Sequence, residues 1–216
     1  ASNNVAVGLE CLDLITTGDN NTAIGYQALD ANTTGAQNTA LGQGAMGANT
    51  TASNNTAIGR EALKANTTGF QNTALGAAAG QTMTTANYSC ALGDYSLQAT
   101  TTGGSNTAVG SNAMFANTTG TNNVGVGYAA LDANTTGSNN VALGRNALTA
   151  NTTAGTNTGI GDRALAANTT AAGNTGIGNT ALEACTTSPS NTAVGENALG
   201  DVTTGTGQNV GIGRYA

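Results

Sequence analysis

A short alternation of branched and small residues recurs every 17 residues along the chain. The repeated unit reads N-T-A-(I/L/V)-G-x-x-A-L-x-A-N-T-T-G-x-N; its second position is Thr, Val or Cys and its fourth is Ile, Leu or Val in all thirteen copies. Because residues two apart share one face of a strand, each N-T-A-I-G segment is predicted to form a short β-strand. The opposite face carries only Ala or Gly, so we expect both faces to be packed, one of them very tightly.

The second half of each unit, such as YQALDANTTG, has a less regular pattern. Only six residues separate Gly25 from Asn32, which would leave a full helix marginal. We therefore expect a second short strand or a 3₁₀ turn, giving a flattened, two-sided coil. Asn at positions 1 and 12 of the unit is expected where the chain turns, and stacked Asn side chains can hydrogen-bond along a column.

An unbroken short period is the signature of a solenoid in which each unit forms one coil. Twelve complete units run from Asn4 to about residue 207, and a partial unit covers 209–216 after one residue is inserted near Gly207 and Gln208. We interpret residues 1–216 as a single repeat array: an all-β solenoid, or β-roll, of 17-residue coils. Neither end carries an atypical capping unit, which favours a segment of a longer protein.

Composition supports a thin coil and narrows the choice of partners. Two Phe, no Trp and one Pro leave little bulk for a globular core. The five basic residues are scattered and the net charge is -6, whereas nucleic-acid binding needs clustered Lys and Arg. No stretch approaches the ~20 apolar residues of a membrane helix. We predict no nucleic-acid partner and no membrane insertion in this segment.

The three cysteines, Cys11, Cys90 and Cys185, occupy three different positions of the unit. Disulfide frameworks and metal sites show close or paired spacings, so we interpret each cysteine as a small apolar substitute within the coil. Without disulfides to staple the coils, association with other copies of the chain is a natural way to bury the second apolar face.

The branched residues at position 4 are the candidates for that buried column. We expect them to be buried either inside the coil or in a core shared between copies of the chain. Representative members are Ile24, Ile58, Val109, Leu143 and Val194.

Residues 55–59 (NTAIG) and 106–110 (NTAVG) resemble the head repeats of trimeric autotransporter adhesins, which carry an NSVAIG motif. The NTAIGYQAL and NTTG segments are also similar to repeats of long bacterial surface proteins and phage-type tail fibres. The resemblance spans practically the whole chain, although this unit is longer and has a near-constant Thr-Thr pair. It implies a left-handed β-roll of three parallel chains. It also implies an extracellular, cell-surface or virion fibre that presents a binding surface.

The expected function is therefore that of a non-catalytic structural fibre or adhesin segment. Its expected partners are further copies of itself, as a trimer or filament, and a host surface glycan. A carbohydrate-binding tail fibre is a lesser alternative.

Candidate catalytic and metal chemistry is sparse. The absence of His excludes Ser-His-Asp and Cys-His catalysis and His-based metal sites. Asp162 and Glu196 share position 6 two coils apart, about 10 Å, a separation suited to an inverting glycosidase. Arg145 lies one coil from Asp162 in the same column, which favours a solvated ion-pair ladder instead.

No ligand-binding motif accompanies the glycines or the acidic residues. The glycines lack a phosphate-loop context, and acids such as Asp13 and Asp30 lack a calcium-binding repeat. We predict no catalytic, cofactor-binding or metal-binding residues and no cofactor.

The Thr-Thr pair supports an alternative function. Regular ranks of Thr on a β-solenoid resemble the ice-binding faces of antifreeze proteins, whose spacing matches ordered water. The competing interpretation is that Thr is β-branched, compatible with turns and able to hydrogen-bond along a column. The candidate surface-binding rank consists of Thr33, Thr50, Thr67, Thr118, Thr135, Thr152 and Thr169.

Two further features have both a functional and a structural interpretation. Asn-Thr-Thr is an N-glycosylation acceptor at seven sites, but we favour an Asn ladder that stabilises the turn. Tyr88 and Tyr95 flank a lapse of the consensus at residues 80–83, where a bulge could form a carbohydrate-binding aromatic patch and a tolerated defect is the alternative. The seven acceptor sites are Asn32, Asn49, Asn66, Asn117, Asn134, Asn151 and Asn168.

Overall fold

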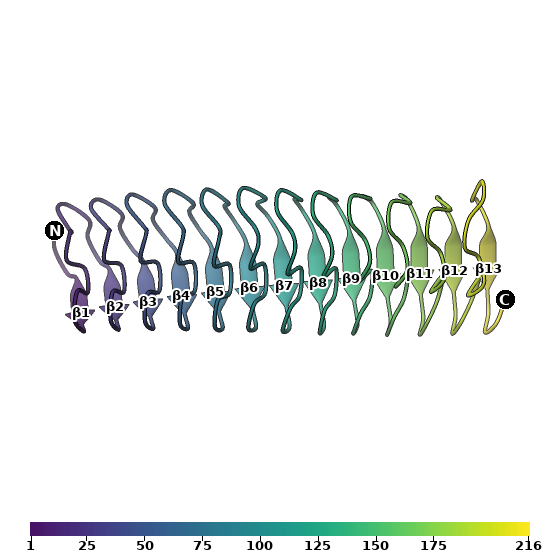
Figure 1. Ribbon diagram of the computed structural model, residues 1–216, viewed down its shortest axis with the longest axis horizontal. Coiled ribbons are helices and arrows are strands. Elements are labelled where there is room, and N and C mark those ends of the chain that lie inside the picture. Colours follow the sequence, from purple (N-terminus) through teal and green to yellow (C-terminus); the bar gives the residue numbers. More distant parts are fainter. The chain divides into compact units, whose positions relative to one another are not determined.

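The computed structural model describes all 216 residues, and its regular secondary structure is entirely parallel β-strand (Figure 1). Thirteen three-residue strands follow one another in chain order, one per coil, which confirms the all-β solenoid. Contacts divide the chain into two compact units, residues 1–106 and 107–216. The structure contains no helix that is long and apolar enough to cross a membrane.

The first unit contains β1 (Val5–Val7), β2 (Thr22–Ile24), β3 (Thr39–Leu41), β4 (Thr56–Ile58), β5 (Thr73–Leu75) and β6 (Cys90–Leu92). The second unit contains β7 (Thr107–Val109), β8 (Val124–Val126), β9 (Val141–Leu143), β10 (Thr158–Ile160), β11 (Thr175–Ile177), β12 (Thr192–Val194) and β13 (Val210–Ile212).

Equivalent residues of successive coils pair in register. Ala23 of β2, for example, lies opposite Ala40 of β3. In the second unit Thr192 of β12 pairs with Val210 of β13, a separation of 18 residues. The inserted residue is therefore accommodated in the loop before β13, as the sequence spacing predicts, and the strand register is kept.

The second half of the coil is a run of tight turns, so the expected second strand is wrong and no continuous 3₁₀ segment forms. The amide of Ala28 donates to the carbonyl of Gly25 within the coil at 3.3 Å, whereas that of Leu29 donates to Ala45 of the next coil at 3.0 Å. Gln27 and Leu29 have φ values of 56° and 51°. These left-handed residues reverse the chain direction locally, which an extended strand cannot do.

Glycine at position 5 is required by both its conformation and its surroundings. Gly59 has a φ of +135°, and a Cβ added to it would lie 2.3 Å from the carbonyl oxygen of Gly76 in the next coil. Only glycine combines that φ with so close a backbone neighbour. Both requirements therefore hold at the same residue.

The core of each coil is thin and is filled from both halves of the unit. Ala23 of the strand and Ala28 and Leu29 of the turns have no exposed surface. At Gly159, which replaces the strand Ala, an added Cβ would lie 3.1 Å from the Ala164 carbonyl and 3.3 Å from Leu148 Cγ. The strand thus has room for little more than a methyl group on its inner side, and the Leu from the turns supplies the bulk.

Candidate interaction surface

The outer side of the strands forms a surface that we call the strand face: the residues at positions 2 and 4 of every coil. Position 2 supplies a column of mainly Thr and Val, and position 4 supplies a column of Ile, Leu and Val. No residue of either column is charged or fully buried. In the first unit the columns are Val5, Thr22, Thr39, Thr56, Thr73, Cys90 and Val7, Ile24, Leu41, Ile58, Leu75, Leu92.

The second unit repeats the same pattern. Its columns are Thr107, Val124, Val141, Thr158, Thr175, Thr192, Val210 and Val109, Val126, Leu143, Ile160, Ile177, Val194, Ile212.

The aliphatic column of the strand face is not buried within the coil. Ile24 and Val194 are each 37% exposed, Leu143 is 45% exposed, and Ile58 and Val109 are half-buried. Within the single chain, the outer face of the strands is therefore only partly covered. Because the space inside the coil admits only Ala or Gly, the large side chains must point outward. The interior of the coil, one of the two burial sites expected for this column, is therefore excluded.

The two threonines of each Thr-Thr pair differ in environment. The first is half-buried in the candidate rank, and its hydroxyl donates to a carbonyl of the next coil, as from Thr33 to Thr50 at 3.1 Å and from Thr135 to Thr152 at 3.0 Å. The second is exposed, as at Thr34. The rank Thr33, Thr50, Thr67, Thr118, Thr135, Thr152 and Thr169 thus supports the turn, and the more accessible rank is its neighbour.

Two columns of buried Asn side chains stabilise the turns of the coil through hydrogen bonds. At position 1, the amide of Asn38 donates to Asn21 Oδ1 at 3.1 Å and to the Ala52 carbonyl at 2.8 Å. At position 12, Asn49 donates to Asn32 Oδ1 at 3.0 Å. The predicted Asn ladder is therefore present.

The potential glycosylation acceptors belong to the second ladder. All seven of these Asn side chains are completely buried, so the folded coil has no accessible amide for a glycan. They are Asn32, Asn49, Asn66, Asn117, Asn134, Asn151 and Asn168.

The carboxylates considered for glycosidase chemistry are both engaged in exposed ion pairs. Arg145 binds Asp162 of the next coil through two contacts of 2.9 and 3.0 Å. Arg214 binds Glu196 at 3.0 Å. The predicted ion-pair ladder accounts for Arg145 and Asp162.

The remaining titratable groups show modest, local perturbations. The ammonium of Lys64, 2.8 Å from Glu61, lowers the pKa of that carboxyl through a hydrogen bond. Burial raises the pKa of the Cys11, Cys90 and Cys185 thiols, which keeps them protonated at neutral pH. All three cysteines are free, and no group of three or more Cys, Asp or Glu side chains could hold a metal ion.

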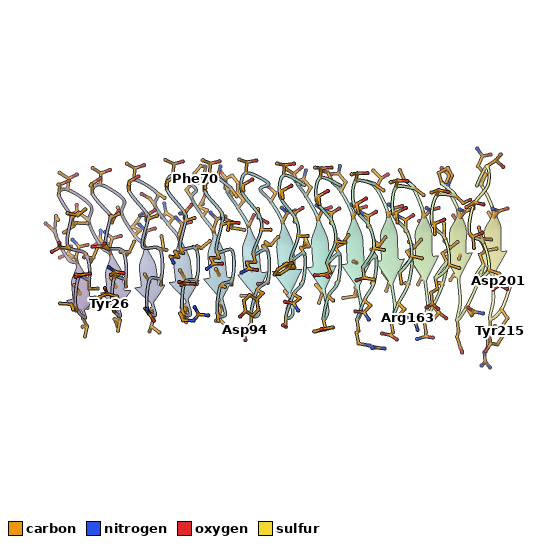
Figure 2. All side chains as sticks on the ribbon, in the orientation of Figure 1. Tyr26, Phe70, Asp94, Arg163, Asp201 and Tyr215 are labelled. Atoms are coloured by element: carbon orange, nitrogen blue, oxygen red, sulfur yellow. The ribbon has the colours of Figure 1, made fainter.

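The aromatic residues near residues 80–83, where the consensus lapses, do not form the patch that the sequence suggested. Tyr88 packs edge to face against Phe70 of the preceding coil, with ring centroids 5.1 Å apart. Phe70 lies at the edge of the first unit opposite Asp94, the neighbour of Tyr95 (Figure 2). Tyr88 and Tyr95 therefore form no common patch. Sequence reasoning missed Phe70 because its nearness to Tyr88 depends on coil stacking.

At residues 80–83 two substitutions compensate for each other, and the chain does not bulge. Gly80 stands where the other coils have Leu or Met, and Met83 stands where most of them have Asn. A Cβ on Gly80 would lie 3.0 Å from Met83 Sδ, so Met83 fills the space left by the missing Leu. Both residues are fully buried or nearly so.

No family model matches the chain, and no curated protein or solved structure is significantly similar to it. Inferences about function therefore rest on the surfaces of the coil.

Proposed function

We propose that the chain is a non-enzymatic structural segment of an extracellular, cell-surface or virion fibre, whose solenoid associates with further copies of itself and presents its outer edges for attachment. The observation that carries the proposal is the outward-facing aliphatic column of the strand face, which is exposed or half-buried in every coil of each unit. Because the repeats resemble the heads of trimeric adhesins, we propose a parallel trimer as the assembly.

A second copy of the chain is the partner that best matches the strand face. Equivalent side chains recur at the strand spacing of about 4.8 Å, and another copy repeats that spacing in every coil. Neither column carries a charge, so the net charge of -6 resides on other surfaces. Full burial of an exposed aliphatic side chain is worth about 1.5–3 kcal/mol. Side chains such as Ile24 and Leu143 are already more than half covered, so each would add roughly 1 kcal/mol to the free energy of association, and every coil supplies one such side chain.

Sedimentation equilibrium at micromolar concentration tests the proposed assembly. We expect a trimer for the natural chain and a shift toward monomer for Leu75→Asp combined with Leu143→Asp. Both leucines are exposed in the single chain, 50% and 45%, so the coil itself should tolerate the substitutions. Gln37→Asp combined with Asn139→Asp places the same charges on the exposed outer edge and is the matched control. A stable folded monomer of the natural chain would refute the assembly.

Cys90 offers an independent test of register. It lies in the position 2 column of the strand face and is a free thiol. In a parallel, in-register assembly, Cys90 side chains of neighbouring chains occupy the same layer, so a short bismaleimide should join chains through Cys90. Efficient crosslinking that persists in Cys90→Thr would contradict this register.

Ice binding is a second candidate, supported by the regular exposure of Thr on the structure. The outer threonines at position 14 are exposed, and the strand face adds alternating Thr and aliphatic columns. The strand face cannot contact ice and another chain at once. We propose this activity only for an unassociated chain, and thermal hysteresis with ice-crystal shaping measures it. Purified monomer without either effect at high concentration would eliminate the candidate.

A further inference from the structure

Phe70 and Tyr88 form an aromatic pair at the outer edge of the first unit, by which we mean positions 16 and 17 of its coils. Phe70 is 37% exposed and Tyr88 is 58% exposed, so neither ring fills the core of the coil. Elsewhere in this unit, positions 16 and 17 carry small or polar residues. The coils stack without aromatic residues there, and the pair is therefore not explained by the fold.

Backbone contacts hold the two rings in a defined relation. The amide of Phe70 donates to Asn87 Oδ1 at 2.8 Å, and the amide of Tyr88 donates to the Phe70 carbonyl at 3.2 Å. The ring planes meet at 79°. In an edge-to-face pair, the ring that offers its edge keeps both of its faces free of the other ring.

The surroundings of the pair are polar and uncharged. Asn54 and Gln71 precede Tyr88 in the same column, and both are exposed. Their amides can each donate and accept hydrogen bonds. The residues at positions 16 and 17 between Ala36 and Ser105 include no acid and no base.

We propose that Phe70 and Tyr88, with Asn54 and Gln71, form a binding site for a neutral pyranose oligosaccharide. A sugar ring presents an apolar C–H face that packs on an aromatic ring, and its hydroxyl groups pair with amides that donate and accept. The absence of nearby charge matches a neutral ligand. This inference rests on the proposed function of the chain as a surface-presenting fibre, for which it names one ligand class and one site.

Saturation-transfer NMR and calorimetry with cellohexaose and chitohexaose test the site. We expect saturable binding of at least one of these sugars to the natural chain. Phe70→Ser with Tyr88→Asn should weaken it at least about tenfold, because both apolar contacts are lost. Ser53 occupies the position of Phe70 one coil earlier and Asn54 that of Tyr88 two coils earlier, so the fold should accept the change. Tyr128→Ser is the control: it removes a 55% exposed ring from the second unit and introduces the residue found at Ser111 one coil earlier.

Unchanged binding in the double variant, equal loss in Tyr128→Ser, or no saturable binding of either sugar would overturn the proposal. Sedimentation of the same samples keeps the two proposals separate. If the sugars fail to bind while the natural chain still forms trimers, the glycan site is wrong and the fibre assembly stands.

Discussion

In the position 12 column, the side-chain oxygens of Asn134 and Asn151 each accept a hydrogen bond from the Asn one coil further along. Asn151 Oδ1 accepts from Asn168 at 3.0 Å, but Asn168 Oδ1 has no hydrogen-bond partner because the next member of the column is Cys185. The thiol donates instead to the Ser188 carbonyl at 3.2 Å. A buried acceptor without a donor costs about 1–3 kcal/mol, so Asn168 is a weak point of the ladder. The side-chain oxygens of Asn49 and Asn66 also lack a donor.

Cys185→Asn should repair that point. The new amide can donate both to Asn168 Oδ1 and to the Ser188 carbonyl, as Asn134 and Asn151 do with their equivalent partners, and we expect stabilisation of about 1 kcal/mol. Thermal unfolding measures the gain. Cys185→Ala serves as the control, since it removes the thiol without supplying a donor; equal stability of the two variants would contradict the ladder argument.

Asp132 makes stability depend on pH. Partial burial raises the pKa of its carboxyl in the folded chain. A carboxyl with a raised folded pKa stabilises the fold when protonated, and that advantage is lost as pH rises from the unfolded pKa through the folded one. Asp132→Asn should therefore raise the melting temperature at pH 7, and the gain should vanish below the unfolded pKa of about 3.9. Asp201→Asn removes the same charge from an exposed position and is the control. A gain of equal size at pH 2.5 would be inconsistent with titration of Asp132.

At the scale of the element, the spacing between coils is limited by backbone contacts. The position 5 glycines lie against the carbonyl of the next coil, and each strand has only three residues in which to form its ladder. Small displacements at this point would therefore separate strand pairs on both sides.

Gly59→Ala should destabilise the chain by at least about 2 kcal/mol, because the φ is unfavourable for Ala and the new Cβ meets the Gly76 carbonyl. Gly47→Ala is the matched control: its Cβ would have only ordinary contacts, the nearest at 3.4 Å, and its position carries Asp30 and Lys64 in adjacent coils. Urea unfolding should distinguish them. Equal effects would show that glycine content, and not the close contact, determines stability.

The effects of substituting Gly80 and Met83 on stability should be coupled. Gly80→Leu alone inserts a side chain where Met83 already lies, and Met83→Asn alone leaves a void beside Gly80. The double variant restores the consensus Leu and Asn, so it should recover most of the stability that either single change loses. A double-mutant cycle should give a coupling of about 1 kcal/mol or more. Additive losses would mean that the two side chains do not share one space.

At the scale of the whole molecule, assembly and stability should be linked. If the strand face is buried between copies, the folded state is favoured by mass action and the melting temperature rises with protein concentration. The natural chain should show this dependence, and Leu75→Asp combined with Leu143→Asp should abolish it. Scanning calorimetry over a hundredfold concentration range makes the measurement. A melting temperature independent of concentration would count against the shared core.

The repeat alone determined most of the fold. The 17-residue period, the three-residue alternation around Ala23 and the invariant Gly at position 5 predict a strand in the first half of every coil, in register, because each coil meets the same pattern in its neighbours. The Asn ladders and the Arg145–Asp162 pair follow from the same periodicity. Local sequence and simple stacking suffice for these features, since each requires only the residue one coil away.

Only the tertiary structure decided which side of each strand faces inward and how the second half folds. Alternation separates Ile24 from Ala23 but does not say which of them meets the core; the close approach of the turns, which leaves room only for Ala, settles it. The left-handed backbone at Leu29 has no sequence signal, because Leu disfavours that conformation and adopts it here through hydrogen bonds to neighbouring coils. For the same reason the Phe70–Tyr88 contact, between residues 18 apart and in different columns, depends on the three-dimensional path of the coil.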